Sequence, residues 1–419
     1  MNKLKHHEHP EQMKVKYFSF GTKILTVIAG LGMTAFIYRF FVGLDVATNL
    51  DNQYPWGIWI AIDVASGVAL AAGGFTTAAL AEIFHREKYH SIIRPALLTA
   101  MLGYTFVAIG LLADLGRYYN IWHPMMPNMW SGNSVLFEVG ICVMIYLTVL
   151  YIEFLPIVVE RFKSKVNLPS LLAILNKPIE LFLKIADKTL GRVTFIFIIA
   201  GVVLSCLHQS SLGTLMVIAP TKMHPLWYSP WSPLLFLLSA ISVGFPMVIF
   251  ESILASRSFK IKPEKKVLSS IAKYTPIILS VYFIIKVLDL IYRDALHYIW
   301  EGSLSSYSFS VEMLIGVIIP TIMLLNNKIR NNINGLFIAA SMVIFGVVLN
   351  RINVYLVAYN PLYEIETYFP SVIEIAVTIG LISTLILVYR FVVIVFPVIS
   401  IDGETKKKME NKNQFGIIK

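Results

Sequence analysis

The stretch VTFIFIIAGVVLSCLHQSSLGTLMV, residues 193–217, contains no acidic residue, no lysine and no arginine. About 20 mostly apolar residues are enough for a helix to cross the hydrocarbon core of a bilayer, so this stretch predicts a membrane span. Nine further windows of this kind lie near 20–42, 57–84, 92–116, 133–157, 231–256, 274–292, 308–326, 333–350 and 371–398. The sequence therefore predicts an all-α polytopic membrane protein with ten transmembrane helices.

The composition agrees with a membrane protein. Hydrophobic residues make up 57% of the 419-residue chain and charged residues 14%, whereas soluble globular domains carry about 25% charge. The first span follows a basic, histidine-rich segment that lacks a small-residue cleavage site, so we expect an uncleaved first helix. The expected organisation is a cytoplasmic N-terminal segment at 1–19, a ten-helix transmembrane domain at 20–398 and a cytoplasmic tail at 399–419.

The basic residues behind the net charge of +10 are concentrated in alternate connections between the spans and in the terminal segments. Of the 35 Lys and Arg residues, 29 lie in the two terminal segments and in alternate connections: 1–23, 86–94, 161–192, 257–273, 328–330 and 390–419. The opposite loops are expected to hold Arg39, Arg117, Lys222, Arg293 and Arg351. By the positive-inside rule both termini are predicted to be cytoplasmic. This pattern argues against a nucleic-acid partner.

A faint internal repeat links two predicted spans. The third ends in LADLGRYYNIW (112–122) and the seventh in LDLIYRDALHYIW (288–300). Four spans separate the copies, and an even separation indicates parallel repeats. The repeat predicts two four-helix bundles, at 57–217 and 231–350, flanked by the first and last helices. The alternative is that Asp, Arg, Tyr and Trp are simply common at outer interfaces.

Two segments outside the spans have a distinct character. The longest basic connection contains KPIELFLKIADKTL (177–190), in which lysines recur at helical spacing beside apolar residues. This pattern predicts an amphipathic helix at the membrane interface. The C-terminal GETKKKMENKNQ (403–414) is polar and without apolar periodicity, which predicts a disordered tail.

Ionisable side chains occur inside many predicted spans. Each costs about 2.5–3.5 kcal/mol to insert at a helix centre, so each is a candidate functional residue. The helix directions and a rise of about 1.5 Å per residue place most of them in the outer half of the membrane. These are Asp63, Asp114, Glu138, His208, Lys286, Asp289, Glu312 and Glu374, whereas Glu153 and Glu251 lie near the cytoplasmic edge. We therefore expect an outer-side pocket with a polar route inward.

The run HQSS at 208–211 places four polar residues consecutively, so they point all round the helix. Only a polar cavity or neighbouring helices can satisfy such a run within lipid. A lone buried histidine can equally be a hydrogen-bonded structural residue. Similarly, Lys286 and Asp289 stand at i and i+3 and can simply neutralise one another.

The histidines and cysteines bear on cofactors. Of nine histidines, His208 is the one inside a predicted span, whereas a transmembrane haem with two axial histidines needs two that face each other. Cys142 and Cys206 are too few for an iron–sulfur cluster, which usually takes four cysteines. We therefore expect no haem and no metal in this chain, and any iron–sulfur chemistry to lie in a partner.

Four stretches strongly resemble the NrfD/PsrC family, and within it the HybB-type membrane subunit of respiratory nickel–iron hydrogenases. They are YPWGIWIAIDVASGVALAAGGFT (54–76), RPALLTAMLGYTFVAIGLLADLGRYYNIWHP (94–124), LHQSSLGTLMVIAPTKMHPLWYSPWSPLLFLLSA (207–240) and LNRINV (349–354). The resemblance implies a subunit in the inner membrane that binds menaquinone or ubiquinone near the outer face. It also implies electrons from a docked ferredoxin-like iron–sulfur subunit, which joins the chain to the small and large hydrogenase subunits.

Under this resemblance the polar residues take roles in quinone chemistry, and no catalytic residue beyond them is expected. His208 and Asp114 are candidates to bind the quinone carbonyls, Arg117 to orient Asp114, and Asp63 and His123 to complete the site. A proton path is assigned to Glu138, Glu153, Glu251, Lys286, Asp289, Glu312 and Glu374. Two alternatives stay open: an ion-coupled secondary transporter, or the membrane anchor of another oxidoreductase of this family. Electron direction, quinone type, proton pumping and oligomeric state are not predicted.

Overall fold

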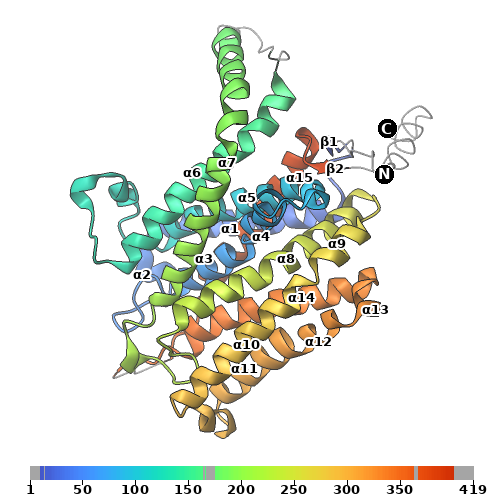
Figure 1. Ribbon diagram of the computed structural model, residues 1–419. Coiled ribbons are helices and arrows are strands. Elements are labelled where there is room, and N and C mark those ends of the chain that lie inside the picture. Colours follow the sequence, from blue (N-terminus) through green and yellow to red (C-terminus); the bar gives the residue numbers. More distant parts are fainter. Residues whose placement is uncertain (1–9, 14, 164–165, 167–174, 363–366, 401–419) are drawn as a thin grey trace.

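Ten helical spans form most of the described part of the protein (Figure 1). We describe a computed structural model at residues 10–13, 15–163, 166, 175–362 and 367–400. The spans are α1 (Phe20–Val42), α3 (Ile58–Leu70) continued by α4 (Gly73–Ala78) and η1 (Ala79–Ile83), η2 (Glu87–Tyr89) continued by α5 (His90–Asp114), α6 (Val135–Phe162), the part of α7 (Asn176–Thr214) from residue 193, α8 (Ser232–Phe259), α9 (Lys265–Ile271) continued by α10 (Tyr274–Tyr292), α11 (Leu304–Met313) continued by η9 (Leu314–Ile318) and α12 (Ile319–Leu325), α14 (Ile333–Ile352) continued by η10 (Asn353–Val357), and α15 (Val372–Val395). The prediction of an all-α polytopic membrane protein is confirmed.

Short elements join the spans. They are α2 (Leu44–Ala47), η3 (Tyr118–Asn120), η4 (His123–Met125), η5 (Pro127–Met129), η7 (Pro220–Lys222), η8 (Leu296–Trp300), α13 (Asn327–Arg330), β1 (Pro10–Glu11) and β2 (Ile399–Ser400). Three of the continuing segments, η1, η9 and η10, are π-helical turns. The last of these carries the ninth span beyond residue 350, where the sequence predicted its end.

Serine side chains start four of the spans. Ser19, Ser134, Ser303 and Ser371 each accept a hydrogen bond from the backbone N–H three residues later. Such caps satisfy donors that have no partner in the first turn of a helix. In the last span the reciprocal acceptor is Glu374, a residue that the sequence had placed in the proton path.

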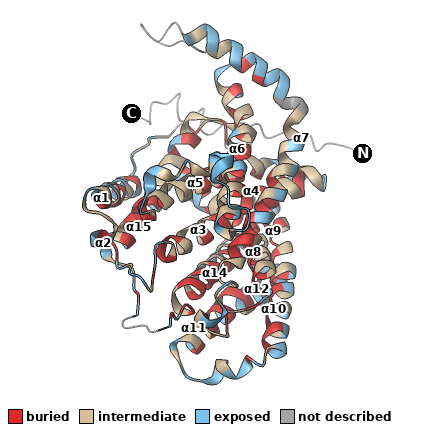
Figure 2. Ribbon diagram, turned by 90° about the vertical axis from the view of Figure 1, so that its left-hand side faces the viewer, coloured by how far each residue is buried: buried red, intermediate tan, exposed pale blue. Residues whose placement is uncertain are grey.

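The core lies where α3 and α4 meet α5 and α8. The span of α3, α4 and η1 is 67% buried over its apolar window and α8 is 61% buried, more than the other spans of the described chain. Helix α8 packs against α3, α4, α7, α10 and α14, while α1 pairs with α15, which packs on α5. Figure 2 shows the buried residues on these central helices. These contacts enclose the polar side chains described below.

The α1–α15 pair depends on two glycines. Gly32 and Gly380 meet with their backbones in contact, so a Cβ on either would overlap the other. We expect Gly32→Val to separate these helices and to lower the unfolding temperature of the purified protein by several degrees, since overpacking costs about 1–3 kcal/mol. Gly30→Val is the matched control, because a Cβ at Gly30 meets nothing within 4 Å. Equal unfolding temperatures for the two variants would contradict this interpretation.

The two ends of the chain lie together. Strand β1 pairs antiparallel with β2, and Met13 N donates to Val393 O. Arg390 donates to the carbonyl oxygens of Lys16 and Tyr17. The described segments before α1 and after α15 therefore lie on one side of the spans, as an even number of spans requires. Residues 1–9 and the predicted tail at 403–414 are outside the described residues.

Helix α7 begins well before its membrane span. The predicted amphipathic helix at 177–190 is helical, but it continues directly into the fifth span instead of forming a separate element. Leu183 and Ala186 pack against Val159 of α6, whereas Phe182 and Ile185 are exposed. The two helices project from the rest of the molecule (Figure 1).

Candidate functional site

Three carboxylates gather at those ends of α3, α5 and α15 that lie opposite the β1–β2 pair. Asp114, at the last residue of α5, is fully buried, and its Oδ2 accepts a hydrogen bond from Gly57 N. Asp63 and Glu374 lie close enough to interact electrostatically with it. The other carboxylate oxygen of Asp114, Oδ1, has no hydrogen-bond partner among the described residues. This cluster is the first polar centre.

Arginine 39 supplies the positive charge of this centre. It is buried in α1, and its guanidinium donates to the carbonyl oxygens of Ala113 and Leu115 at the end of α5. The sequence placed Arg39 in a loop and assigned the orientation of Asp114 to Arg117. Arg117 is exposed, and no hydrogen bond or ion pair of the described residues joins it to Asp114, so the structure gives this assignment no support.

The other two carboxylates are held by α15 and by the segment before it. Asp63 Oδ2 accepts from the Thr378 hydroxyl, which also accepts from Trp59 Nε1 at 3.1 Å. Glu374 Oε1 accepts from the Tyr368 hydroxyl at 2.7 Å. Burial, with Glu374 beside it, raises the pKa of the Tyr368 hydroxyl. Tyr368 therefore keeps its proton and remains a donor to Glu374.

Three residues of the HQSS run contact neighbouring helices. His208 Nε2 is hydrogen-bonded to the Tyr104 hydroxyl, and Gln209 Nε2 donates to Val68 O at 2.9 Å. The Ser211 hydroxyl donates to Glu138 Oε1 at 2.7 Å. These three side chains thus meet α5, α3 and α6, whereas His208 Nδ1 and Gln209 Oε1 have no hydrogen-bond partner among the described residues.

These contacts divide the predicted outer pocket. Tyr104 stands ten residues before Asp114 on α5, which is roughly 15 Å along the axis at about 1.5 Å per residue. No hydrogen bond among the described residues joins His208 to Asp63 or Asp114. Direct hydrogen bonds therefore do not connect His208 with those two carboxylates, and the shared cavity stays a prediction. His208 lies deeper in the membrane, between the rings of Tyr104 and Tyr146.

Glu153 and Glu251 lie in the halves of their spans nearer the basic ends. Glu153 Oε1 faces Gly201 of α7. Glu251 has Thr99 and Tyr389 as polar neighbours, and its Oε1 has no partner among the described residues. A continuous route between these residues and the outer carboxylates is not formed by direct hydrogen bonds of the described side chains.

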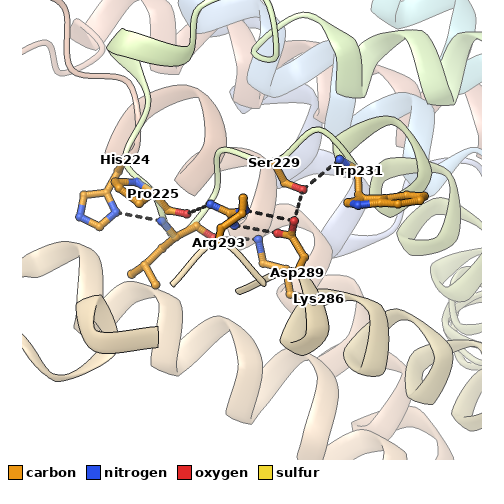
Figure 3. A network of polar contacts seen from close by, with 8 residues as sticks. His224, Pro225, Ser229, Trp231, Lys286, Asp289 and Arg293 are labelled. Atoms are coloured by element: carbon orange, nitrogen blue, oxygen red, sulfur yellow. Dashed lines mark hydrogen bonds and ion pairs between the residues drawn. The ribbon is translucent and has the colours of Figure 1, made fainter. Parts of the chain in front are cut away.

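A second polar centre lies at the C-terminal end of α10, and Figure 3 shows how its side chains converge. Arg293 makes two hydrogen bonds to Asp289, of 3.0 and 2.7 Å, and a third to Pro225 O at 2.9 Å. Lys286 Nζ donates to Leu226 O at 2.7 Å. Asp289 therefore pairs with Arg293 and not with Lys286, the alternative that the sequence had left open, and Lys286 binds the loop between η7 and α8.

Glu312 is the hub of a buried network next to this centre. Its carboxylate accepts from Trp227 Nε1 at 2.9 Å, Asn350 Nδ2 at 2.8 Å and Asn353 Nδ2 at 2.7 Å. Arg351, also placed in a loop by the sequence, is fully buried in α14. Its guanidinium donates to the Asn350 side chain and lies over the Phe236 ring at 3.7 Å. The sequence missed Arg351 because it stands close to the end of its span.

The two centres occupy equivalent places in the predicted repeat. Asp114 ends the third span and binds the backbone at Gly57, which precedes the second span. Asp289, near the end of the seventh, accepts from the Ser229 hydroxyl at 2.8 Å, just before the sixth. The guanidinium partners differ, since Arg293 comes from the same helix whereas Arg39 comes from α1.

The connection between α5 and α6 carries exposed apolar side chains. Among them, Trp122, Met125, Met129 and Trp130 are 45–65% exposed. His123, which the sequence placed in the quinone site, lies in η4 of this connection and packs against the ring of Trp122. No hydrogen bond of the described residues links it to the three carboxylates.

Comparison with known proteins identifies relatives along nearly the whole chain. The family model described as polysulphide reductase, NrfD, matches residues 46–362. A protein of Nitratidesulfovibrio vulgaris is 38% identical over 90% of this chain and 94% of its own length. The probable Ni/Fe-hydrogenase 2 b-type cytochrome subunit of Escherichia coli is 32% identical over 93% and 95%. The menaquinone reductase integral membrane subunit of N. vulgaris is 24% identical over 95% and 96%.

The comparison corrects the expectation about haem. The sequence predicted none, but the Escherichia coli relative is described as a b-type cytochrome subunit, a description that implies haem. The described residues do not fit a haem held by two histidines, because His208 is the one histidine in the middle of a span and Tyr104 occupies its Nε2. Within the described part of the chain, no three His, Cys, Asp or Glu side chains are placed to hold a metal ion.

Proposed function

This chain belongs to the NrfD family of oxidoreductase membrane subunits, and from that membership we propose that it exchanges electrons with a quinone for a respiratory complex. The electrons pass between a docked extracytoplasmic iron–sulfur subunit of a nickel–iron hydrogenase and menaquinone or ubiquinone. The names of two relatives, a hydrogenase subunit and a menaquinone reductase subunit, support this assignment.

The buried carboxylate cluster at Asp114 is the observation that carries the proposal. Reducing a quinone to a quinol takes two electrons and two protons, so the site needs groups that donate and accept protons. Asp114 has one oxygen without a partner, with Asp63 and Glu374 beside it. In this proposal Asp114 exchanges the proton at a quinone oxygen, and the two neighbouring carboxylates replace it. Arg39 holds the end of α5 in place.

The exposed connection between α5 and α6 is the proposed docking surface for the iron–sulfur subunit. Its Trp and Met side chains are of the kinds enriched at protein interfaces. It follows α5 directly after Asp114, so a cluster bound there lies on the same side of the membrane as the proposed quinone site.

Quinone binding tests the proposal directly. A short-chain menaquinone analogue should raise the unfolding temperature of the purified chain in proportion to the logarithm of its concentration, as expected for a ligand that binds the folded state. Copurification should recover hydrogenase subunits. Absence of a quinone effect, together with ion-coupled solute uptake by vesicles that contain this chain alone, would support a transporter instead.

The proposed orientation puts both termini and 257–273 in the cytoplasm and 117–132 outside, in the inner membrane. In a chain from which Cys142 and Cys206 have been removed, Ser131→Cys should react with an impermeant thiol reagent in intact spheroplasts. Glu87→Cys, which is exposed at the opposite ends of the spans, should react only after permeabilisation. The reverse pattern would contradict the orientation and the outer location of the quinone site.

A further inference from the structure

An apolar groove lies on the second half of the molecule, away from both polar centres. It has a volume of about 410 Å³ and is lined by Ile315 of η9 and by five residues of α14: Phe337, Ile338, Ser341, Met342 and Phe345. The single hydroxyl among them, that of Ser341, donates to Phe337 O within the helix at 2.8 Å. Ile338 and Phe345 are 52% and 47% exposed. The groove therefore opens toward lipid and is suited to a hydrocarbon chain.

Two glycines define the outer end of the groove. Gly316 and Gly346 meet with their backbones in contact, so the helices cross closely there. From Phe345 to Phe337 the lining descends two turns of α14, roughly 12 Å at about 1.5 Å per residue. The groove thus runs from near mid-membrane toward the basic end of the spans, about the depth that one acyl chain occupies in its leaflet.

A cation lies at the basic end of this groove. The guanidinium of Arg257 lies 4.7 Å from the centre of the Phe337 ring, and its NH2 donates to Asn334 Oδ1 at 3.1 Å. Phe250 stacks on Phe337 at 5.1 Å and fixes that ring. The ion pairs of the described residues do not include Arg257, and its side chain is exposed. Lys328, also exposed, lies at the same end of the spans.

We propose that this groove binds an anionic phospholipid, with one acyl chain along α14 and the phosphate at Arg257. The apolar lining and the positive charge of Arg257 together identify the class of lipid that binds. An isoprenoid quinone tail would fill the apolar part but brings no anion to Arg257. A zwitterionic lipid brings a phosphate whose charge its own ammonium group cancels. Basic residues near a bilayer surface select anionic headgroups for this reason.

Native mass spectrometry of the full chain, with phosphatidylglycerol and phosphatidylcholine of identical acyl chains, tests the proposal. The wild type should retain one phosphatidylglycerol in preference to phosphatidylcholine. Arg257→Gln should lower that preference about fivefold, the effect expected of one cation near an anionic headgroup. Lys23→Gln is the matched control, because Lys23 is exposed at the basic end of α1, in the α1–α15 pair.

A second variant examines the groove itself. Ile338→Trp adds bulk to the lining at an exposed position and should abolish retention of the lipid while the unfolding temperature stays near that of the wild type. The proposal is overturned if the wild type retains both lipids equally, if Arg257→Gln and Lys23→Gln behave alike, or if Ile338→Trp still retains one phosphatidylglycerol. It is also overturned if a menaquinone displaces the lipid at equal concentration.

Discussion

Asp114→Asn should lower quinone-linked turnover of the assembled complex by at least about 100-fold, because a positioned proton donor or acceptor contributes 10²–10⁴-fold. The amide keeps an oxygen that can accept from Gly57 N, so assembly should persist. Electron transfer from the partner to an artificial dye should also persist, since that chemistry lies outside this chain. The measurement is the ratio of quinone-linked to dye-linked activity.

Asp294→Asn is the control for this variant. Asp294 is exposed in the loop after α10 and has a positive φ of 54°, which Asn tolerates. The Asp294→Asn substitution makes the same chemical change at a residue that does not belong to the carboxylate cluster. If Asp114→Asn and Asp294→Asn keep equal ratios, the cluster is not the quinone site. If Asp114→Asn loses both activities, its role is structural.

Glu312→Leu should destabilise the protein by at least about 3 kcal/mol. The substitution leaves three buried donors, on Trp227, Asn350 and Asn353, without an acceptor, and each such donor costs about 1–3 kcal/mol. A folded domain is stable by only about 5–15 kcal/mol, so little of the variant should accumulate in the membrane. Thermal unfolding in detergent and the yield of assembled complex measure this loss.

The matched control is Glu301→Leu, an identical replacement at an exposed position after η8. It should leave the yield and the unfolding temperature near wild type, as surface substitutions usually do. An unchanged yield of Glu312→Leu would mean that water or a rearranged helix satisfies the three donors.

The spans could be predicted from the sequence because a membrane helix depends on hydrophobic content and length, which are local properties. The partners of buried charges could not. The sequence paired Asp114 with Arg117 three residues away, but the guanidinium at that centre comes from Arg39 on another helix. The distribution of basic residues also assigned Arg39 and Arg351 to loops, although both are buried. Which helices touch is decided by packing, and a single sequence carries little record of it.

The surroundings of His208 could not be predicted for the same physical reason. Its depth along one helix could be predicted, and depth alone suggested that it joins the other outer residues. Its ring instead points between Tyr104 and Tyr146, because the rotation of a helix about its own axis is set by its neighbours. Periodicity could have signalled this only if one face of the fifth span were clearly more polar.

The pairing of α1 with α15 has a consequence for how the protein is made. Arg390 binds Tyr17 O across a separation of 373 residues. At a synthesis rate of about 5–20 residues per second, the ribosome needs roughly 20–75 s to supply the partner of the first helix. During that time the glycine face of α1 stays open in the bilayer, although Arg39 meets its partners on α5 much earlier, since they lie 74 and 76 residues further along the chain. We therefore expect the yield of this protein to depend on an insertase or a membrane chaperone that shields α1 until translation ends.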